Sequence, residues 1–240
     1  MSRTVLVLGA GIGGIVAAET LRKLLPASDR VIAVNRTDRH FFPPSLLWLM
    51  VGDRKPEDFT RSLDRLVNRG VELRRGIVTR IDPARKEIEI DGQPLAADAL
   101  VVALGADYAP EAIPGLAEAG LNIYTMEGAG AIHDALTRFK GGRVVILTAA
   151  PMYKCPAAPY EASLLVDAFL RKHGLRDKTT IEFFAAEPRP MFVAGPEVGA
   201  AVRGMVETQG IAYHPEHQVK EVDPAARRIT FASGATAEYD

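Results

Sequence analysis

The sequence has little of several features that mark whole classes of protein. It contains a single cysteine, which excludes an internal disulfide framework and suits a reducing compartment. Lys and Arg number 29 and Asp and Glu number 30, so the net charge of −1 gives no electrostatic reason to expect nucleic acid as a partner. No stretch reaches the roughly 20 apolar residues that span a bilayer, and the apolar run Val5–Ala18 lacks a basic leader and a cleavage site. We therefore expect a cytoplasmic protein, soluble or at most peripheral on the inner face of the membrane.

The N-terminal segment has the pattern of a β-α-β unit. Thr4–Leu8 is a short β-branched and leucine-rich run typical of a central parallel strand, and Ile12–Leu25 follows as a helix that Pro26 stops. Val31–Val34 is a second strand, so the three elements fit within about 30 residues. The composition agrees with this class, because 48% apolar and 25% charged residues are ordinary for an α/β protein.

The rest of the chain predicts two domains of similar plan. Gly105–Gly120 is rich in Gly, Pro and Ala, and we interpret it as a linker between domains 1–108 and 109–240. The first domain is completed by a helix over Pro56–Arg69, antiparallel strands over Val71–Ile81 and Lys86–Ile90, and a buried strand over Ala99–Ala103. The second is predicted to contain strands Arg143–Thr148 and Thr179–Ala185, helices Tyr160–Lys172 and Glu197–Gln209, a strand at Ile211, and a hairpin of Gln218–Val222 with Arg228–Phe231. The expected fold is α/β, with two Rossmann-like domains on parallel central sheets.

The turn after the first strand carries a glycine motif of nucleotide-binding proteins. Gly9, Gly11 and Gly14 fit G-x-G-x-x-G directly between a strand and a helix, the context in which this pattern is informative. The first glycine makes the tight turn, the second lets the backbone approach a pyrophosphate, and the third allows close packing of helix on strand. The alternative is an unliganded turn, which the context disfavours.

The position expected to bind the ribose carries no acid. Asn35 stands at the end of the second strand, where an amide can bond a hydroxyl without the strength of a charged acceptor. Arg36 follows it and could meet a 2′-phosphate, which would favour NADP, or lie over an adenine. These two residues leave the identity of the dinucleotide open without removing the site.

The single cysteine lies where the second domain would be expected to carry a second glycine loop. Cys155 follows a predicted strand in a proline-rich loop, next to Lys154 and just before a helix. The cation and the helix N-terminus both favour a thiolate, so we interpret the residue as reactive rather than as a small core side chain. Glu161, in the first turn of that helix, either caps it or exchanges protons in a cleft.

Two further segments complete a recognisable set, namely Phe42–Trp48 with Gly52, and Ala99–Ala106. Together with Gly9–Gly14 and Lys154–Glu161, they resemble the sulfide:quinone oxidoreductases and the flavoprotein subunit of flavocytochrome c sulfide dehydrogenase. The cysteine segment is the most specific of the four, because ordinary relatives among the pyridine-nucleotide disulfide oxidoreductases keep an NADH-binding glycine loop there. The resemblance covers essentially the whole chain.

The resemblance implies an FAD-dependent enzyme that oxidises sulfide or another small sulfur substrate. In that family two electrons pass through FAD to a quinone or to a haem subunit, and a cysteine at the position of Cys155 faces the flavin and carries sulfur. Cys155 and Glu161 are therefore the expected catalytic residues. Peripheral membrane contact of a longer protein and homo-oligomerisation are left open. The expected cofactor-binding residues are Gly9, Gly11, Gly14, Asn35, Arg36, Pro43 and Gly105.

The sequence departs from the family in three places. The family uses a second redox cysteine from its C-terminal half, and this chain has none. It also uses a late Gly-Asp segment whose aspartate holds the flavin, whereas this chain stops at Tyr239-Asp240. Leu104 replaces the usual threonine beside Gly105. We therefore expect the N-terminal part of the family fold, truncated before one wall of the flavin site and before the membrane-docking helices.

Two other functions compete with sulfide oxidation. A type II NADH:quinone reductase is a related flavoprotein, but the second domain lacks the glycine loop that would bind a nicotinamide nucleotide. A nucleotide-binding module without turnover would explain the missing wall and thiol, but it leaves the intact cysteine segment unexplained. No metal site is expected, because His214 and His217 are separated by a proline and have no cysteine nearby.

Overall fold

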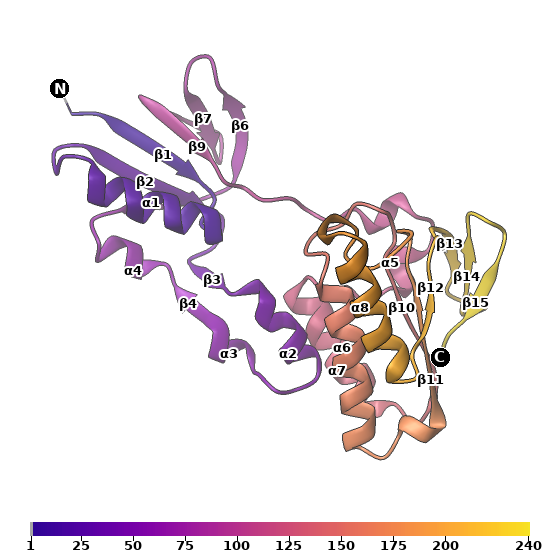
Figure 1. The fold of residues 1–240 in the computed structure, drawn as a ribbon. Helices are drawn as coiled ribbons and strands as arrows, with labels where there is room; N and C mark the ends of the chain where they lie inside the picture. The colour runs from indigo at the N-terminus through magenta and orange to yellow at the C-terminus, as the bar shows by residue number, and fades with distance from the viewer. Residues whose placement is uncertain (1) are drawn as a thin grey trace. The chain divides into compact units, whose positions relative to one another are not determined.

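The computed structural model describes residues 2–240 and shows a mixed α/β chain (Figure 1). The chain divides into two units, which are described separately. The first comprises the residues up to Phe42 together with Pro56–Tyr108, and the second comprises Pro43–Lys55 together with Ala109–Asp240. Among the described residues, no helix combines the length and the apolar character that crossing a bilayer requires. Both units contain a parallel sheet, so the predicted α/β class is confirmed.

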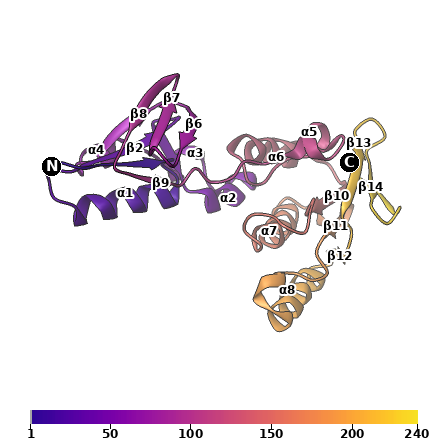
Figure 2. The ribbon, with the colours of Figure 1, turned by 90° about the horizontal axis from the view of Figure 1, so that it is seen from above.

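The first unit is built on a parallel sheet in the order β5-β2-β1-β9. Side chains on β1 alternate between its faces, since Val7 packs on the side of α1, whereas Leu6 and Leu8 pack against a three-stranded antiparallel layer. Figure 2 shows this layer, β6–β8, on the face of the sheet opposite α1. The elements are β1 (Thr4–Leu8), α1 (Ile12–Leu24), β2 (Arg30–Asn35), β5 (Glu72–Arg75), β6 (Val78–Asp82), β7 (Glu87–Ile90), β8 (Gln93–Ala96) and β9 (Ala99–Val102).

Two predictions of secondary structure in the first unit are wrong, and the strand predicted as buried over Ala99–Ala103 contains no buried residue. The predicted helix Pro56–Arg69 is instead the sequence α3 (Pro56–Phe59), β4 (Thr60–Ser62) and α4 (Asp64–Val67). Strand β4 pairs antiparallel with β3 (Arg39–Phe41), and this distant pairing overrides the local preference for helix. The predicted strand Val71–Ile81 is two strands, because its first part, β5, pairs with β2 and its second part, β6, pairs with β7.

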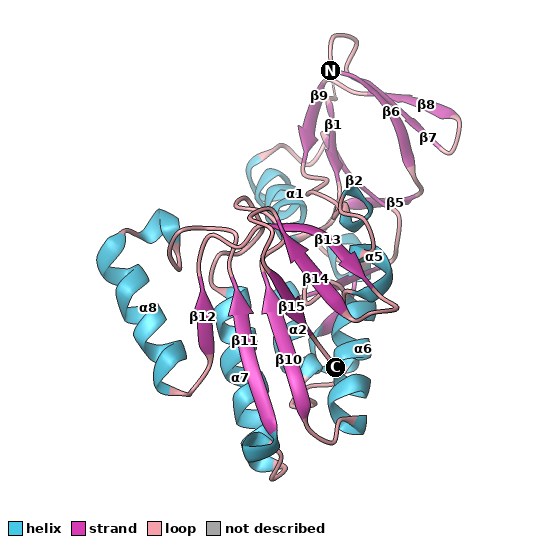
Figure 3. Cartoon of the chain, turned by 90° about the vertical axis from the view of Figure 1, so that its right-hand side faces the viewer, coloured by secondary structure: helices cyan, strands magenta, loops and turns pink. Residues whose placement is uncertain are grey.

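The second unit repeats the plan of the first. Its parallel sheet has the order β10-β11-β12, and helices α7 and α8 connect these strands (Figure 3). On one face of the sheet, Val145, Leu147 and Phe184 pack against a second antiparallel layer, β13–β15. The elements are β10 (Gly142–Leu147), α7 (Ala158–Lys172), β11 (Thr179–Phe184), α8 (Pro196–Thr208), β12 (Ala212–His214), β13 (Val219–Asp223), β14 (Arg228–Phe231) and β15 (Thr236–Glu238).

Several elements of the second unit have no counterpart among the sequence predictions. Helix α6 (Met126–Arg138) begins after Thr125, whose hydroxyl accepts a hydrogen bond from the Gly128 N–H at 3.0 Å. A threonine at this position is an ordinary N-cap, so the sequence did carry the signal. Strand β15 was also not predicted. The expected linker Gly105–Gly120 contains a 3-10 helix, η2 (Pro110–Ala112), and a short helix, α5 (Leu116–Ala119).

The segment Pro43–Lys55 belongs to the second unit although it precedes residue 108 in the chain. It forms the 3-10 helix η1 (Pro43–Ser45) and helix α2 (Leu46–Met50). Helix α2 lies against α6 and α7, and four of its five side chains are buried. Burial of this apolar helix explains why the segment packs with the second unit, because removing apolar surface from water is the main favourable contribution to such packing.

Candidate cofactor and thiol sites

The loop between β1 and α1 has a shape that glycine permits and other residues do not. Gly9 has a φ of +92°, and a Cβ on it would lie 2.5 Å from the Ala103 carbonyl oxygen. A Cβ on Gly14 would lie 1.8 Å from the Gly9 carbonyl oxygen, so the turn touches the start of α1 backbone to backbone. A Cβ on Gly11 would meet nothing within 4 Å, which leaves open space at the N-terminus of α1. A cradle with these properties fits a pyrophosphate.

Asn35, the last residue of β2, is hydrogen-bonded to the backbone of this loop. Its Oδ1 accepts a hydrogen bond from the Ala10 N–H at 3.0 Å, and its Nδ2 donates to the Thr37 carbonyl oxygen at 2.9 Å and to the Thr37 hydroxyl at 3.1 Å. An ionised carboxylate has no donor and could make only the first of these bonds. His40 lies in the same region. Burial lowers its pKa, and a hydrogen bond with the backbone of Ala10 acts in the opposite direction.

The structure brings the first-unit candidates to one edge of the sheet, at the carboxyl ends of its strands. The three glycines follow β1, and Asn35 is the last residue of β2. Gly105 follows β9, has a φ of +77°, and has open space where a Cβ would lie. Arg36 is exposed beside Asn35. Pro43 is part of the second unit, where it begins η1 and is exposed.

Cys155 occupies a strained turn between β10 and α7. Its φ is +54°, a left-handed conformation that costs a residue with a Cβ about 1–2 kcal/mol. Its carbonyl oxygen accepts a hydrogen bond from the Ala158 N–H at 3.0 Å, which closes the turn that leads into α7. The thiol is free and exposed. Glu161 lies in the first turn of α7 and is also exposed.

Sequence reasoning missed a buried polar cluster beside this loop. Glu187, which is 3% exposed and follows β11, accepts hydrogen bonds from Thr148 Oγ1 at 2.6 Å, from the Tyr153 hydroxyl at 2.5 Å and from the Tyr160 hydroxyl at 2.6 Å. Burial, and then the bond to Glu187, raise the pKa of Tyr153 and of Tyr160. Burial also raises the pKa of Tyr213, which lies 3.4 Å from the Tyr160 hydroxyl, to about 12. The available signal was an acidic residue shortly after a predicted parallel strand.

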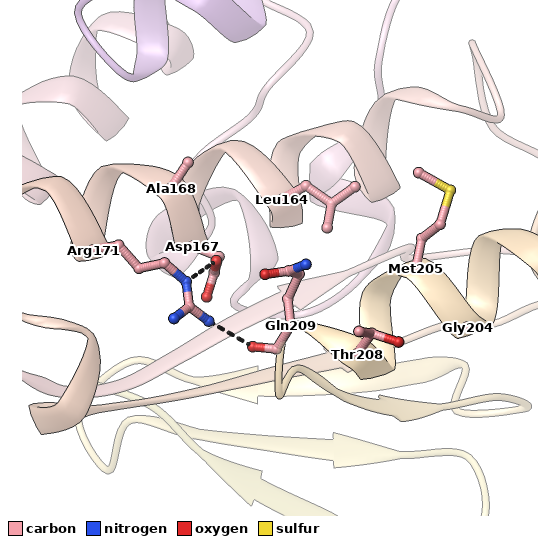
Figure 4. Close-up of a pocket in the computed structure, with 8 residues that line it drawn as sticks. All are labelled: Leu164, Asp167, Ala168, Arg171, Gly204, Met205, Thr208 and Gln209. Carbon is pink, nitrogen blue, oxygen red and sulfur yellow. Dashed lines mark hydrogen bonds and ion pairs between the residues drawn. The ribbon is translucent and has the colours of Figure 1, made fainter.

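A groove between α7 and α8 is separate from these residues (Figure 4). Leu164 lines it from α7 and Met205 lines it from α8. Arg171 extends from α7 and donates to Asp167 at 2.7 Å and to the Gln209 carbonyl oxygen at 3.1 Å. None of the sequence-predicted site residues lines this groove, so it carries no part of the predicted chemistry.

Proteins of similar sequence include several quinone oxidoreductases. The mitochondrial sulfide:quinone oxidoreductase of Mus musculus is 29% identical over 236 residues, which is 95% of this chain and 51% of that protein. The sulfide-quinone reductase of Aquifex aeolicus is 29% identical over 231 residues, which is 93% of this chain and 53% of that protein. The type II NADH:quinone oxidoreductase of Staphylococcus saprophyticus is 31% identical over 123 residues, or 50% of this chain and 31% of that protein. The chain thus spans about half the length of the sulfide:quinone oxidoreductases that it matches.

Solved structures and the family match agree with these relatives. The sulfide:quinone oxidoreductase of Aquifex aeolicus has a TM-score of 0.89 at 26% identity, covering 98% of this chain and 56% of that one. NDH2 of Plasmodium falciparum in complex with NADH has a TM-score of 0.78 at 15% identity, covering 100% and 54%, a likeness that shows the fold alone. The resemblance predicted from four segments is thereby confirmed. Since the pyridine nucleotide-disulphide oxidoreductase family matches residues 3–240, the chain belongs to that family.

Proposed function

We propose that this chain forms the FAD-binding and sulfur-handling part of a sulfide:quinone oxidoreductase. The family implies a flavin cofactor, and the glycine cradle of the first unit supports FAD in particular. Open space at Gly11 admits a pyrophosphate, and the N-terminus of α1 favours its negative charge. The relatives that match along nearly the whole chain are sulfide:quinone oxidoreductases, which supports sulfide as the donor and a quinone as the acceptor.

One observation carries the choice of sulfide over a nicotinamide nucleotide. In the first unit the loop after the first strand, β1, is a glycine cradle, whereas the equivalent loop after β10 in the second unit carries Cys155. Glu187 and its hydroxyl partners occupy the ends of β10 and β11, where a second dinucleotide would need space. We therefore assign sulfur chemistry, rather than NAD(P)H binding, to the second unit.

The glycine cradle would hold the pyrophosphate of FAD, and Asn35 with Arg36 would lie near its ribose and adenine. FAD, when bound, would accept two electrons from sulfide and pass them to the quinone. Asn35 keeps the cradle in shape whether or not it also bonds a ribose hydroxyl, because its Oδ1 already holds the Ala10 N–H. The residues proposed to contact FAD are Gly9, Gly11, Gly14, Asn35, Arg36, Pro43 and Gly105.

Cys155 would take up the sulfur atom. Its thiol and one hydrosulfide ion together form a persulfide, one proton and two electrons: Cys–SH + HS⁻ gives Cys–SSH + H⁺ + 2 e⁻. The new bond joins the two sulfur atoms, and the quinone becomes a quinol by taking the two electrons with two protons. Glu161 would accept the released proton, since an exposed carboxylate close to Cys155 in the chain can exchange it with water.

The test is a sulfide titration of the FAD-loaded protein, followed through the visible absorbance of oxidised flavin. We expect sulfide to abolish this absorbance in the unsubstituted protein, whereas Cys155→Ser retains FAD and keeps its absorbance. Flavin that responds to NADH and not to sulfide would overturn the proposal in favour of a type II NADH:quinone reductase. Flavin that is retained but responds to neither donor would indicate a nucleotide-binding module, and a protein that retains no flavin after desalting would contradict FAD binding by this chain.

A further inference from the structure

We propose that Glu187 is a positioning residue. Through hydrogen bonds it holds residues 148–160, the Cys155 segment, at the end of the parallel sheet of the second unit. The carboxylate comes from the chain after β11, whereas its hydrogen-bond donors lie in the segment between β10 and α7 and in the first turn of α7. The inference deepens the proposed function and rests on it only for the chemical role of Cys155. The placement itself concerns contacts within one unit of this chain.

The three donors lie on both sides of the cysteine. Thr148 directly follows β10, Tyr153 lies within the loop shortly before Cys155, and Tyr160 lies in the first turn of α7 after it. Their oxygen atoms lie 2.5–2.6 Å from the carboxylate oxygens of Glu187. Because both flanks are hydrogen-bonded to one buried group in the chain after β11, the turn between them has little freedom to move.

A carboxylate suits this place because its two oxygens accept all three of these bonds. Each of the three hydroxyls donates a hydrogen bond to Glu187. The Thr148 oxygen is then left to accept, and it accepts from the Ala186 N–H at 2.9 Å. The Tyr160 oxygen is likewise left to accept from the Tyr213 hydroxyl at 3.4 Å. The direction of each bond therefore follows from the single acceptor at the centre.

Apolar packing contributes little to the shape of this loop. Most of its side chains between residues 149 and 157 are at least partly exposed, and Met152 is 90% exposed, so apolar burial stabilises it little. Cys155 nevertheless has a left-handed φ of +54°. Such a conformation persists only where the surroundings determine it. The bonds from Tyr153 and Tyr160 to Glu187 supply that constraint.

The single cysteine allows a direct test, since a nitroxide label attaches at Cys155 and nowhere else. The variant Glu187→Gln keeps the side-chain volume but offers one accepting oxygen in place of two, so at least one of the three hydroxyls loses its acceptor. We expect the electron paramagnetic resonance spectrum of the label to shift toward that of a mobile chain. We also expect the Ala186 amide to exchange about tenfold faster, because its acceptor, Thr148 Oγ1, is held in place by the hydrogen bond to Glu187 that the variant weakens.

The matched control is Asp167→Asn, which alters another buried carboxylate of the same unit. Asp167 accepts hydrogen bonds from Arg171 and Arg176 at 2.7 and 2.5 Å, and neither partner belongs to the segment around Cys155. We expect it to lower the melting temperature while leaving the label mobility and the Ala186 exchange unchanged. Equal changes of label mobility and Ala186 exchange in both variants would show that Glu187 only stabilises the unit in general, and would overturn the proposal. A label mobility and an Ala186 exchange that stay unchanged in Glu187→Gln would also overturn it.

If Glu187→Gln does not fold, Tyr153→Phe removes one of the three bonds with no loss of ring packing. We expect a smaller increase in label mobility than that expected for Glu187→Gln, and no increase would overturn the proposal. Neither readout needs flavin or sulfide. A protein that passes these tests and fails the sulfide titration therefore contradicts the proposed function alone, and the reverse result contradicts the positioning role alone.

Discussion

Asp98 and Asp240 make the same pair of hydrogen bonds in the two units. Asp98 Oδ2 accepts from the Thr4 N–H at 2.7 Å, and the Asp98 N–H donates to the Thr4 carbonyl oxygen at 2.9 Å. Asp240 Oδ2 accepts from the Arg143 N–H at 2.9 Å, and the Asp240 N–H donates to the Arg143 carbonyl oxygen at 3.0 Å. Each aspartate follows an antiparallel layer and holds the start of the first strand, β1 or β10. The two units thus share a specific pair of contacts as well as a topology.

Removing the Asp98 carboxylate should loosen the start of β1. We expect Asp98→Ala to reduce the stability of the first unit by about 1 kcal/mol, because the site is exposed and a single hydrogen bond is lost. The Thr4 amide should exchange faster with solvent, as measured by NMR. The control Asp98→Asn keeps an accepting oxygen and should retain most of the protection. Equal loss in both variants would show that the charge, and not the hydrogen bond, matters.

Alanine substitutions at two glycines of the β1–α1 loop should affect different properties, one the stability of the first unit and the other its affinity for FAD. Gly14→Ala places a Cβ 1.8 Å from the Gly9 carbonyl oxygen, so we expect loss of folding of the first unit, seen as a lower melting temperature. Gly11→Ala places its Cβ in open space, so the melting temperature should hardly change. Its affinity for FAD, measured by calorimetry, should nevertheless fall, because the methyl group occupies the approach of the pyrophosphate. An unchanged affinity in Gly11→Ala would argue against FAD at this loop.

The strain at Cys155 should be measurable by comparing two small replacements. Glycine adopts a φ of +54° freely, whereas alanine keeps the penalty that a Cβ brings. We expect Cys155→Gly to be more stable than Cys155→Ala by about 1 kcal/mol, judged by the midpoint of urea unfolding. If alanine were equal to glycine or better, the segment would not hold the left-handed conformation in solution.

His40 should make stability depend on pH. Burial lowers its pKa in the folded protein, so between the folded and the unfolded pKa values the unfolded chain binds more protons than the folded one. Stability that is present above the unfolded value of about 6.5 should therefore fall as the pH drops through it, and should level off below the folded pKa. The variant His40→Gln should lose this part of the pH dependence. The comparison is of urea midpoints for both proteins from about pH 8 to about pH 5.

Local patterns in the sequence were sufficient for the parts of the site that depend on local structure. The glycine loop was predicted from its place between Thr4–Leu8 and Ile12–Leu25, and the structure has β1 and α1 at nearly the same residues. Strands and helices with a clear apolar period, such as those at Arg143–Thr148 and Tyr160–Lys172, were also predicted within two residues of their bounds. These elements are set by side-chain periodicity and by glycine or proline at their ends, which are properties of neighbouring residues.

The sequence by itself determined the α/β class, the glycine cradle at Gly9–Gly14 and the place of Cys155 before a helix. Only the tertiary structure decided that β4 replaces part of a predicted helix, that α2 packs in the second unit, and that Glu187 gathers three hydroxyl groups around one carboxylate. The physical reason is the same in each case. Strand pairing, apolar burial and buried hydrogen bonds are satisfied by partners far away in the chain, and no local pattern specifies which partner that will be.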